Sequence, residues 1–555
     1  METLLSKATV VDGSGSPRRQ ADVLIAQGRI QRIAEPGALT VGGVSSESSF
    51  SKAVHDVGNR RIDAEGLVLA PGFIDMHAHS DLHLLTEPDH YAKLSQGVTT
   101  EVLGQDGLSY APVDEPTLDV IRQKIAGWNG NPTDLDFDWR SVGEYLGRLD
   151  RSQIAGNAAY LVPQGTVRAL VMGFAEGAPD AAQLARMQEV IAEAMQQGAV
   201  GMSSGLTYTP GMYADSAELT ALCETVAELG GFYAPHHRSY GKGALAAYAE
   251  MIELSKASGC PLHLSHATMN FAENKGRAGE LLALIDEALE CGADITLDSY
   301  PYLPGATTLS ALLPSWASSG SLEQTLQRLE EPETLARIRQ SVEIYGSDGC
   351  HGVTAEWHTI EISGVQNPEL SECVGKTIEQ LSGEQRREPF EVFIELLRRD
   401  RLGTGILQHV GDEPNVRQIM QHRAHTGGSD GILTGAKPHP RSWGTFPRYL
   451  GHYSRELGLL SLEEMVHHLS GRPAARLQLH QRGLIKEGYA ADLVLFDAEQ
   501  IADRASFAQP RQPAVGIHWV FVNGQPAIAA GKPTGARAGR ALRRHATDQG
   551  VIDVR

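Results

Sequence analysis

The middle of the chain alternates short apolar runs with stretches of helical periodicity. Strand-like runs at 158–162, 199–202, 231–234, 261–265 and 294–297 are separated by helix-like stretches at 181–197, 216–229, 244–258 and 279–291. Repeated strand-then-helix units are typical of a parallel sheet, and this many in series favours a (β/α)8 barrel over an open sheet. The alternation therefore predicts an α/β protein built around one barrel.

Both ends of the chain differ from the middle because they contain short strands separated by turns. Such strands are predicted at 8–11, 22–25 and 29–33, and again at 492–496 and 518–522. The last of them precedes Asn523-Gly524, a strong hairpin signal. Since chain termini commonly lie close together, we expect the two ends to pair as one small sheet domain.

These patterns divide the chain into three parts. We expect the sheet domain to use residues 1–66 and 483–555, and the barrel to occupy residues 67–482. Long charged helices from about 303 to 408 interrupt the alternation and indicate an insertion. A length of 555 residues allows such accessory parts, because a single core stops growing beyond roughly 250–300 residues.

Composition excludes several classes of function. A formal net charge of -20 disfavours binding to nucleic acid or to an anionic membrane. No segment reaches the roughly 20 uninterrupted apolar residues of a membrane span, and the N-terminus has no apolar signal core. Five cysteines without a CxxC pair suggest neither a disulfide framework nor a cysteine zinc site. We therefore expect a cytoplasmic protein that acts on a small molecule.

Histidines and an aspartate stand at the ends of predicted barrel strands, where catalytic groups of such barrels lie. His77 and His79 follow the run 68–75, and alternate residues of an extended segment share a face, so this pair can point at one ion. His236 and His266 close two later strands. Two histidines at this spacing favour a metal site over isolated structural groups.

The tetrapeptide Gly-Ser-Asp-Gly occurs twice, at 346–349 and at 428–431. The first copy lies within the predicted insertion, and no barrel strand leads into it. The second copy closes the strand-like segment 426–429 and places Asp430 at the mouth of the barrel. We therefore select Asp430 as the functional carboxylate.

A further aspartate, Asp106, lies in the stretch GQDGLSY directly after the β-like run 98–103. Aspartate beside glycine is the usual composition of a tight turn. A turn at the mouth of a barrel strand is also where a ligand would be needed, so the residues alone leave both readings open.

The chemistry of this set is that of a catalytic zinc site. Imidazole and carboxylate ligands that leave room for water allow the metal to lower the pKa of that water to about 7. Hydrolysis of an amide or a related bond is the expected reaction. No GxSxG, GxGxxG or P-loop pattern offers a competing mechanism.

Six segments in this order closely resemble the N-acyl-D-amino-acid deacylase (D-aminoacylase) branch of the amidohydrolase superfamily. They are GFIDMHAHSD, GAVGMSSGLTYTPGMYAD, YAPHHRS, LHLSHA, DSYPYLPGATTL, and GGSDG followed by PHPRSWGTFPRYLG. The resemblance implies a metal-dependent (β/α)8 TIM barrel, a small β-sandwich made from both chain ends and a small inserted domain. It also implies one or two divalent metal ions, with zinc expected, and an N-acyl amino acid substrate.

Carried over position by position, the resemblance implies a role for each candidate residue. His236 and His266 would hold the tightly bound zinc, while His77, His79 and Asp430 would line a second site. Asp430 would act as general base toward the metal-activated water and then as acid toward the leaving amine. The substrate carboxylate would be bound by two residues, Tyr208 and Arg441; the planar fork of an arginine suits this role.

Three positions depart from the family pattern. The family normally has a metal-binding cysteine where this chain has Asp106, so a carboxylate there is expected to bind or bridge metal through oxygen. Thr268 replaces a lysine that helps to bind the substrate carboxylate, and residues 163–166 read PQGT in place of GHGT. The change at Thr268 leaves the side-chain preference for the substrate open.

Other readings are less well supported. Hydantoinase and dihydroorotase relatives bridge two metals with a carboxylated lysine, and this chain has no lysine between Lys124 and Lys242. Hydrolysis of another D-configured amide, a dipeptide or a cyclic amide, remains the main alternative. A non-catalytic scaffold is disfavoured because every expected ligand is present. The sequence leaves open whether the chain forms a homo-oligomer.

Overall fold

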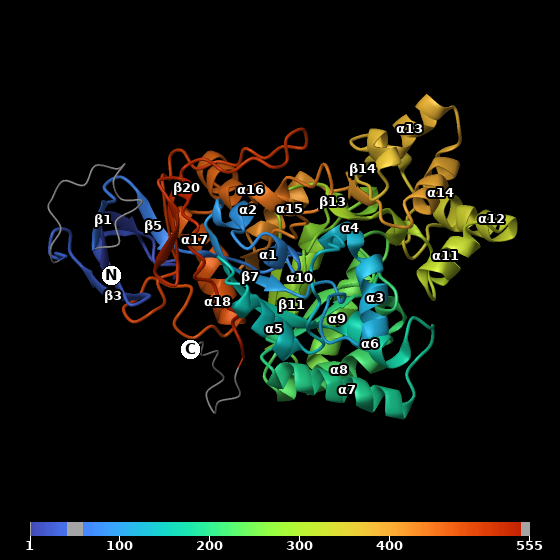
Figure 1. Cartoon of the computed structure of the whole chain (residues 1–555), viewed down its shortest axis with the longest axis horizontal. Helices are drawn as coiled ribbons and strands as arrows, with labels where there is room; N and C mark the ends of the chain where they lie inside the picture. The colour runs from blue at the N-terminus through green and yellow to red at the C-terminus, as the bar shows by residue number, and fades with distance from the viewer. Residues whose placement is uncertain (1, 42–58, 545–555) are drawn as a thin grey trace.

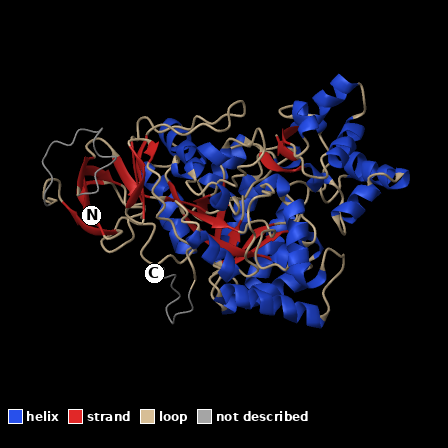
Figure 2. Ribbon diagram, in the orientation of Figure 1, coloured by secondary structure: helices blue, strands red, loops and turns tan. Residues whose placement is uncertain are grey.

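A computed structural model describes residues 2–41 and 59–544. Eight parallel strands lie in the order β16-β12-β11-β10-β9-β8-β7-β6 at the centre of the molecule (Figures 1 and 2). They are β6 (Phe73–Asp75), β7 (Val98–Leu103), β8 (Asn157–Pro163), β9 (Gly201–Gly205), β10 (Phe232–His236), β11 (Leu262–Leu264), β12 (Ile295–Ser299) and β16 (His425–Gly427). A parallel bridge between Ala78 and Gly431 joins the two ends of this row and closes the barrel. The predicted (β/α)8 barrel is confirmed.

Amphipathic helices cover the outside of the barrel. They include α5 (Val142–Arg151), α6 (Gln164–Met172), α7 (Ala181–Gln196), α8 (Ser216–Glu228), α9 (Ala244–Ser258) and α10 (Ala278–Glu290). Helix α7 begins where the Asp180 side chain accepts hydrogen bonds from the backbone N–H groups of the first turn. Its residues Met187, Val190, Ile191 and Ala194 recur at helical spacing and are buried in the barrel core.

Both chain ends contribute to one nine-stranded sheet at the left of Figure 1. Its strands are β1 (Glu2–Val10), β2 (Arg19–Ala26), β3 (Arg29–Ala34), β4 (Arg60–Asp63), β5 (Val68–Pro71), β17 (Leu493–Phe496), β18 (Ile517–Val522), β19 (Gln525–Ala529) and β20 (Lys532–Pro533). Antiparallel pairing of β17 with β5 joins the two ends. Asn523 and Gly524 have positive φ angles of 48° and 78° and connect β18 to β19, so the hairpin prediction is confirmed.

Residues 305–408, in the connection between β12 and β16, form a lobe toward the upper right of Figure 1. It holds a three-stranded antiparallel sheet of β13 (Gly305–Thr308), β15 (Gly405–Gln408) and β14 (Ile360–Gly364). Its helices are α11 (Leu322–Arg328), α12 (Pro332–Gln340), α13 (Ile378–Gln385) and α14 (Pro389–Arg399). Phe393, Leu397 and Ile406 belong to a core of its own. The boundaries at 66/67, 303, 408 and 482/483 stay predictions.

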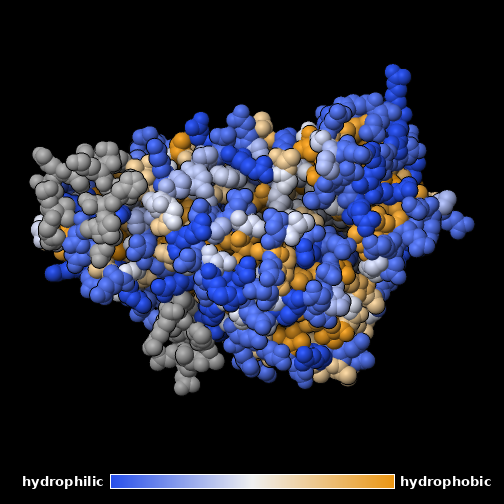
Figure 3. Space-filling view, in the orientation of Figure 1, coloured by the Kyte–Doolittle hydropathy of each residue, from blue (hydrophilic) through white to orange (hydrophobic). Residues whose placement is uncertain are grey.

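The surface drawn in Figure 3 is mostly hydrophilic, and hydrophobic residues gather on it over the barrel helices at the lower right. Within residues 2–41 and 59–544, none of the helices combines the length and the apolar character that crossing a bilayer requires.

Candidate metal centre

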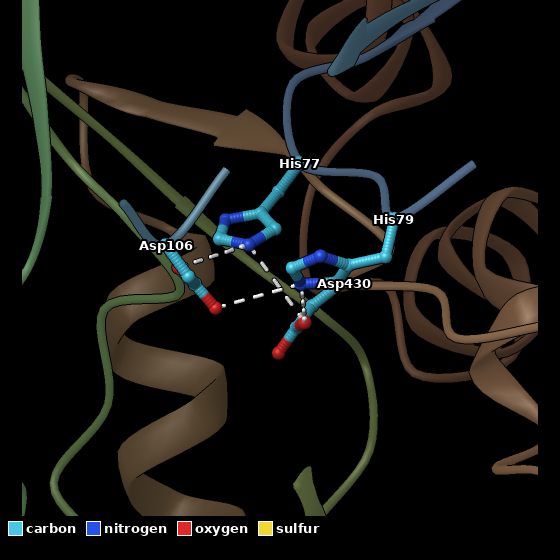
Figure 4. A group of neighbouring side chains, drawn as sticks. All are labelled: His77, His79, Asp106 and Asp430. Carbon is cyan, nitrogen blue, oxygen red and sulfur yellow. Dashed lines mark ion pairs between the residues drawn. The ribbon is translucent and has the colours of Figure 1, made fainter. Parts of the chain in front are cut away.

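The closure of the barrel brings His77, His79 and Asp430 together at the carboxyl ends of β6 and β16 (Figure 4). The backbone N–H of Asp430 donates to the His77 carbonyl at 2.8 Å, and the N–H of His79 donates to the Gly431 carbonyl at 3.2 Å. These bonds leave His79 Nε2 3.2 Å and His77 Nε2 3.7 Å from Asp430 Oδ1. Asp430 is far from His77 and His79 in the sequence, yet the three side chains meet at one edge of the barrel.

Asp106 lies in a tight turn that directs its carboxylate into this cluster. Its φ angle is +55°, and it is flanked by Gly104 and Gly107, which also have positive φ. A Cβ at Gly107 would lie only 2.4 Å from the backbone nitrogen of Gly205, so the turn requires glycine there. The turn and the ligand reading are therefore compatible, because the turn orients the side chain.

The Asp106 carboxylate lies between two pairs of imidazoles. Its Oδ1 is 3.4 Å from His77 Nε2 and 3.5 Å from His266 Nε2. Its Oδ2 is 3.5 Å from His79 Nε2 and 3.6 Å from His236 Nδ1. Each carboxylate oxygen thus faces one histidine of the HxH pair and one histidine from β10 or the end of β11.

The ligand atoms form two overlapping groups whose members lie within 4.8 Å of one another. One group is His77, His79, Asp106 and Asp430; the other is Asp106, His236 and His266. His77 Nε2 and Asp106 Oδ1 are buried and have no hydrogen-bond partner among the described residues. Buried polar atoms without partners are costly, and an ion between them would satisfy both. Imidazole and carboxylate donors at this spacing fit divalent metal.

Electrostatics keep the two carboxylates of the cluster charged. Burial alone would raise the pKa of Asp106, but His77, His236 and His266 hold that pKa well below its usual range. Burial opposes ionisation of Asp430 as well, and the Arg441 guanidinium contributes most to lowering the pKa of Asp430. Ionised carboxylates are the form that binds metal and accepts a proton.

Arg441 at the start of α16 (Arg441–Arg448) is fully buried and lies beside the cluster. Its Nη2 is 2.9 Å from Asp430 Oδ2, and its guanidinium lies 4.4 Å from the centroid of the Tyr300 ring. Its Nε and Nη1 find no hydrogen-bond partner in the part of the chain that the structure describes. These donors leave capacity for an anionic ligand next to Asp430.

Tyr208 contacts the opposite side of the cluster. Its ring centroid is 4.9 Å from that of His236 and 4.7 Å from that of Trp128. Its hydroxyl is 2.9 Å from Thr307 Oγ1 of β13, so the inserted lobe contacts the site here. The carboxylate-binding role of Tyr208 stays a prediction.

Several supporting residues escaped the reading of the sequence. Asp298 near the end of β12 lies 3.0 Å from His263 Nε2, accepts the backbone N–H of His266 at 3.0 Å, and faces His77 Nδ1 at 3.7 Å. Lys93 donates to Asp75 at 2.6 Å and to Ser429 at 2.8 Å, behind the cluster. Such outer partners orient metal ligands. The strand-end position of Asp298 was the available signal.

The other departures from the family pattern have local explanations. Gln164 begins α6 and donates to Glu218 of α8 at 2.9 Å, so the glutamine of PQGT links these two helices. Thr268 donates to the Asn270 side chain at 2.7 Å.

In the first GSDG copy, Asp348 accepts the backbone N–H of Ser315 at 3.0 Å within the inserted lobe.

Comparisons with known proteins agree with this geometry. The model of the amidohydrolase family matches residues 60–528. The D-aminoacylase of Alcaligenes xylosoxydans xylosoxydans is 35% identical over 549 residues, 98% of this chain and 98% of the relative. The N-acyl-D-glutamate deacylase of the same organism is 33% identical and covers 99% of this chain and 98% of its own length.

A solved structure matches along nearly the whole chain. It is N-acyl-D-glutamate deacylase from Bordetella bronchiseptica, complexed with zinc and with a phosphonate inhibitor that mimics the tetrahedral intermediate of its reaction. The TM-score is 0.79 at 31% identity, and the match covers 98% of this chain and 99% of that chain.

Proposed function

The chain belongs to the amidohydrolase family, and from this membership we propose that it is a zinc-dependent deacylase of N-acyl-D-amino acids. The products are a carboxylate and a free D-amino acid. The observation that carries the proposal is the position of Asp430, which contacts both His79 of the metal cluster and the buried Arg441. One carboxylate thus connects the metal ligands with an anchor for the substrate.

The proposed metal ligands are the six residues of the two overlapping groups. They are His77, His79, Asp106, His236, His266 and Asp430. Asp106 belongs to both groups, so we propose that its carboxylate would serve as a ligand in either of them when metal is bound. A bound ion supplies Lewis acidity, which polarises the scissile carbonyl and favours deprotonation of water near neutral pH.

The chain's own residues perform the proton transfer and the positioning. We propose that Asp430 takes the proton of the attacking water through its carboxylate and then donates that proton to the amide nitrogen as the C–N bond breaks. Arg441 binds the α-carboxylate of the substrate through its free Nε and Nη1 donors. Its charge also keeps the pKa of Asp430 low in the free protein.

We further propose a cytoplasmic protein whose partner is this small substrate. The five cysteines are all free, which suits a reducing compartment.

A substrate panel tests the proposed reaction. The zinc-loaded full chain is given matched N-acetyl-D- and N-acetyl-L-amino acids with apolar, aromatic and acidic side chains, and release of the free amine is measured. Hydrolysis of D-substrates in clear preference to their L-enantiomers is expected. Activity only on cyclic amides, dipeptides or L-substrates would refute the deacylase assignment while leaving metal-dependent amide hydrolysis intact.

A further inference from the structure

A pocket opens beside the metal cluster, between the barrel and the inserted lobe. Its cavity volume is about 70 Å³. Leu108, Trp128 and Tyr208 line its barrel side, and Ala311, Leu313 and Leu322 line the side of the inserted lobe. In Figure 1 the helices that flank it, α3 (Glu115–Lys124), α4 (Ala126–Asn129) and α11, lie close together. Since roughly 10–15 Å³ of such space holds one water molecule, the cavity has room for a short chain of a few heavy atoms.

The pocket shares a wall with the metal cluster. The ring centroid of Trp128 is 5.6 Å from that of His79, and the Tyr208 ring contacts His236 at a tilt and Trp128 edge to face. Arg441 contacts Asp430. Asp430 belongs to the ligand group that contains His79, whereas His236 belongs to the other group. With its α-carboxylate on Arg441 beside Asp430, a linear amide would extend its acyl substituent past Trp128 and Tyr208 into this pocket; Tyr208 would then contact the acyl group instead of the α-carboxylate.

Lys124 is the one cation in the lining of this pocket as described. Its ammonium donates to Thr209 Oγ1 at 2.9 Å and lies 4.9 Å from the centroid of the Phe174 ring. No carboxylate pairs with it in residues 2–41 and 59–544, and burial lowers its pKa to about 8. An ammonium has three N–H donors, so two of them lack a protein acceptor here.

We propose that this pocket binds the acyl group of the substrate and that Lys124 selects acyl chains that end in a carboxylate. The inference rests on the proposed deacylase function and adds the class of acyl group to it. A carboxylate at the far end of the chain supplies the charged acceptors that Lys124 lacks, while the carbon chain covers the apolar walls. An acetyl group is too short to do either.

A series of acyl groups on one amino acid tests the proposal without any variant. N-succinyl-, N-glutaryl- and N-adipoyl-D-alanine are compared with the matched amides in which the terminal carboxylate is a carboxamide. At least one carboxylate-ended substrate is expected to have a kcat/KM about tenfold or more above its carboxamide partner. Equal or higher values for every carboxamide would overturn the proposal.

Substitutions of Lys124 give the second test. In Lys124→Met the ratio of kcat/KM between the carboxylate and the carboxamide substrate falls about tenfold or more, and Lys124→Arg keeps most of it. Lys275→Met, which removes an exposed lysine outside the lining of the pocket, leaves the ratio unchanged. An unchanged ratio in Lys124→Met would refute the role of Lys124.

The outcome stays informative if the deacylase assignment fails. Should no N-acyl-D-alanine and no other D-substrate of the panel above be hydrolysed, the proposed function is wrong. Calorimetric binding of N-succinyl-D-alanine and of its carboxamide to the zinc-loaded chain then tests the pocket alone. Tighter binding of the carboxylate that is lost in Lys124→Met supports the pocket, and equal binding overturns it.

Discussion

The metal cluster and the pocket beside it adjoin each other but are built in different ways. The six cluster residues come from the carboxyl ends of barrel strands and are buried, and their carboxylates face histidines or Arg441. The pocket is formed by α3, α4, the segment after β9 and the inserted lobe, and its lone cation has no carboxylate partner in the described chain. Under the two proposals, the strand ends hold the chemistry and the connecting segments set the selectivity.

Removal of metal should have the largest effect because it disables the cluster and leaves the pocket intact. We expect chelation to lower kcat by more than about a hundredfold, the loss typical when a group that stabilises developing charge is removed. Added Zn²⁺ restores the activity. Turnover and metal content are measured on the same samples, and full turnover in metal-free protein would show that the cluster is not the reaction centre.

Substitution of Asp106 tests whether one carboxylate serves both metal positions. We expect Asp106→Ala to weaken metal binding by more than the 10–100-fold typical of outer-shell residues. Asp106→Cys should recover binding but shift the preference toward soft ions such as Zn²⁺ over Mn²⁺. The control is Asp348→Ala in the GSDG copy at 346–349, an aspartate that accepts a backbone N–H in the inserted lobe, away from the cluster. Unchanged metal content in Asp106→Ala would mean that this residue serves only the turn.

Arg441 joins the two regions through the substrate. Arg441→Met is expected to lower kcat/KM for N-acetyl-D-amino acids by about tenfold to a hundredfold, since a charge-assisted hydrogen bond contributes roughly 1.5–3 kcal/mol. The corresponding amino-acid amides lack the α-carboxylate and should lose far less. An equal loss for both substrates would assign Arg441 to Asp430 alone.

For N-acetyl substrates, which do not reach Lys124, substitution of this residue should have the smallest effect on turnover and should change stability instead. Burial lowers its pKa from 10.5 to about 8, so between these values the unfolded chain binds a proton that the folded chain does not. Stability therefore rises as the pH increases from about 8 toward 10.5. We expect Lys124→Met to be more stable at pH 7 by about 1–3 kcal/mol.

The extra stability of Lys124→Met over the wild-type chain should shrink over the same pH range. Thermal melting of the variant and of the wild-type chain measures this difference. A Met variant that is less stable at pH 7 would mean that Lys124 is held for packing, which would remove the contrast between the pocket and the cluster.

The sequence predicted the cluster well because its residues follow strands that periodicity identifies. The two GSDG copies illustrate the reason: the one fed by a barrel strand carries Asp430 into the metal cluster, whereas the other caps a turn in the inserted lobe. The closing bridge between Ala78 and Gly431 was not readable from either segment, yet it is what brings Asp430 to His77 and His79.

The sequence could not predict the pocket, and the reason is physical. Lys124 is the last residue of α3 and Leu313 lies in the inserted lobe. No helix or strand periodicity in the sequence relates these two residues. Their proximity depends on how the inserted lobe packs on the barrel. Asp298 directly follows the predicted strand 294–297, but nothing in the sequence pairs it with His263, its partner in the fold.

The most direct measurement of the central claim is the turnover of Asp430→Asn at known metal content. Asparagine keeps the shape of the side chain but cannot take up the proton. With metal content matched to the wild-type chain, we expect kcat for an N-acetyl-D-amino acid to fall by about 10²–10⁴-fold. Near-normal turnover in a variant that still holds its metal would contradict the assignment of Asp430 as the base.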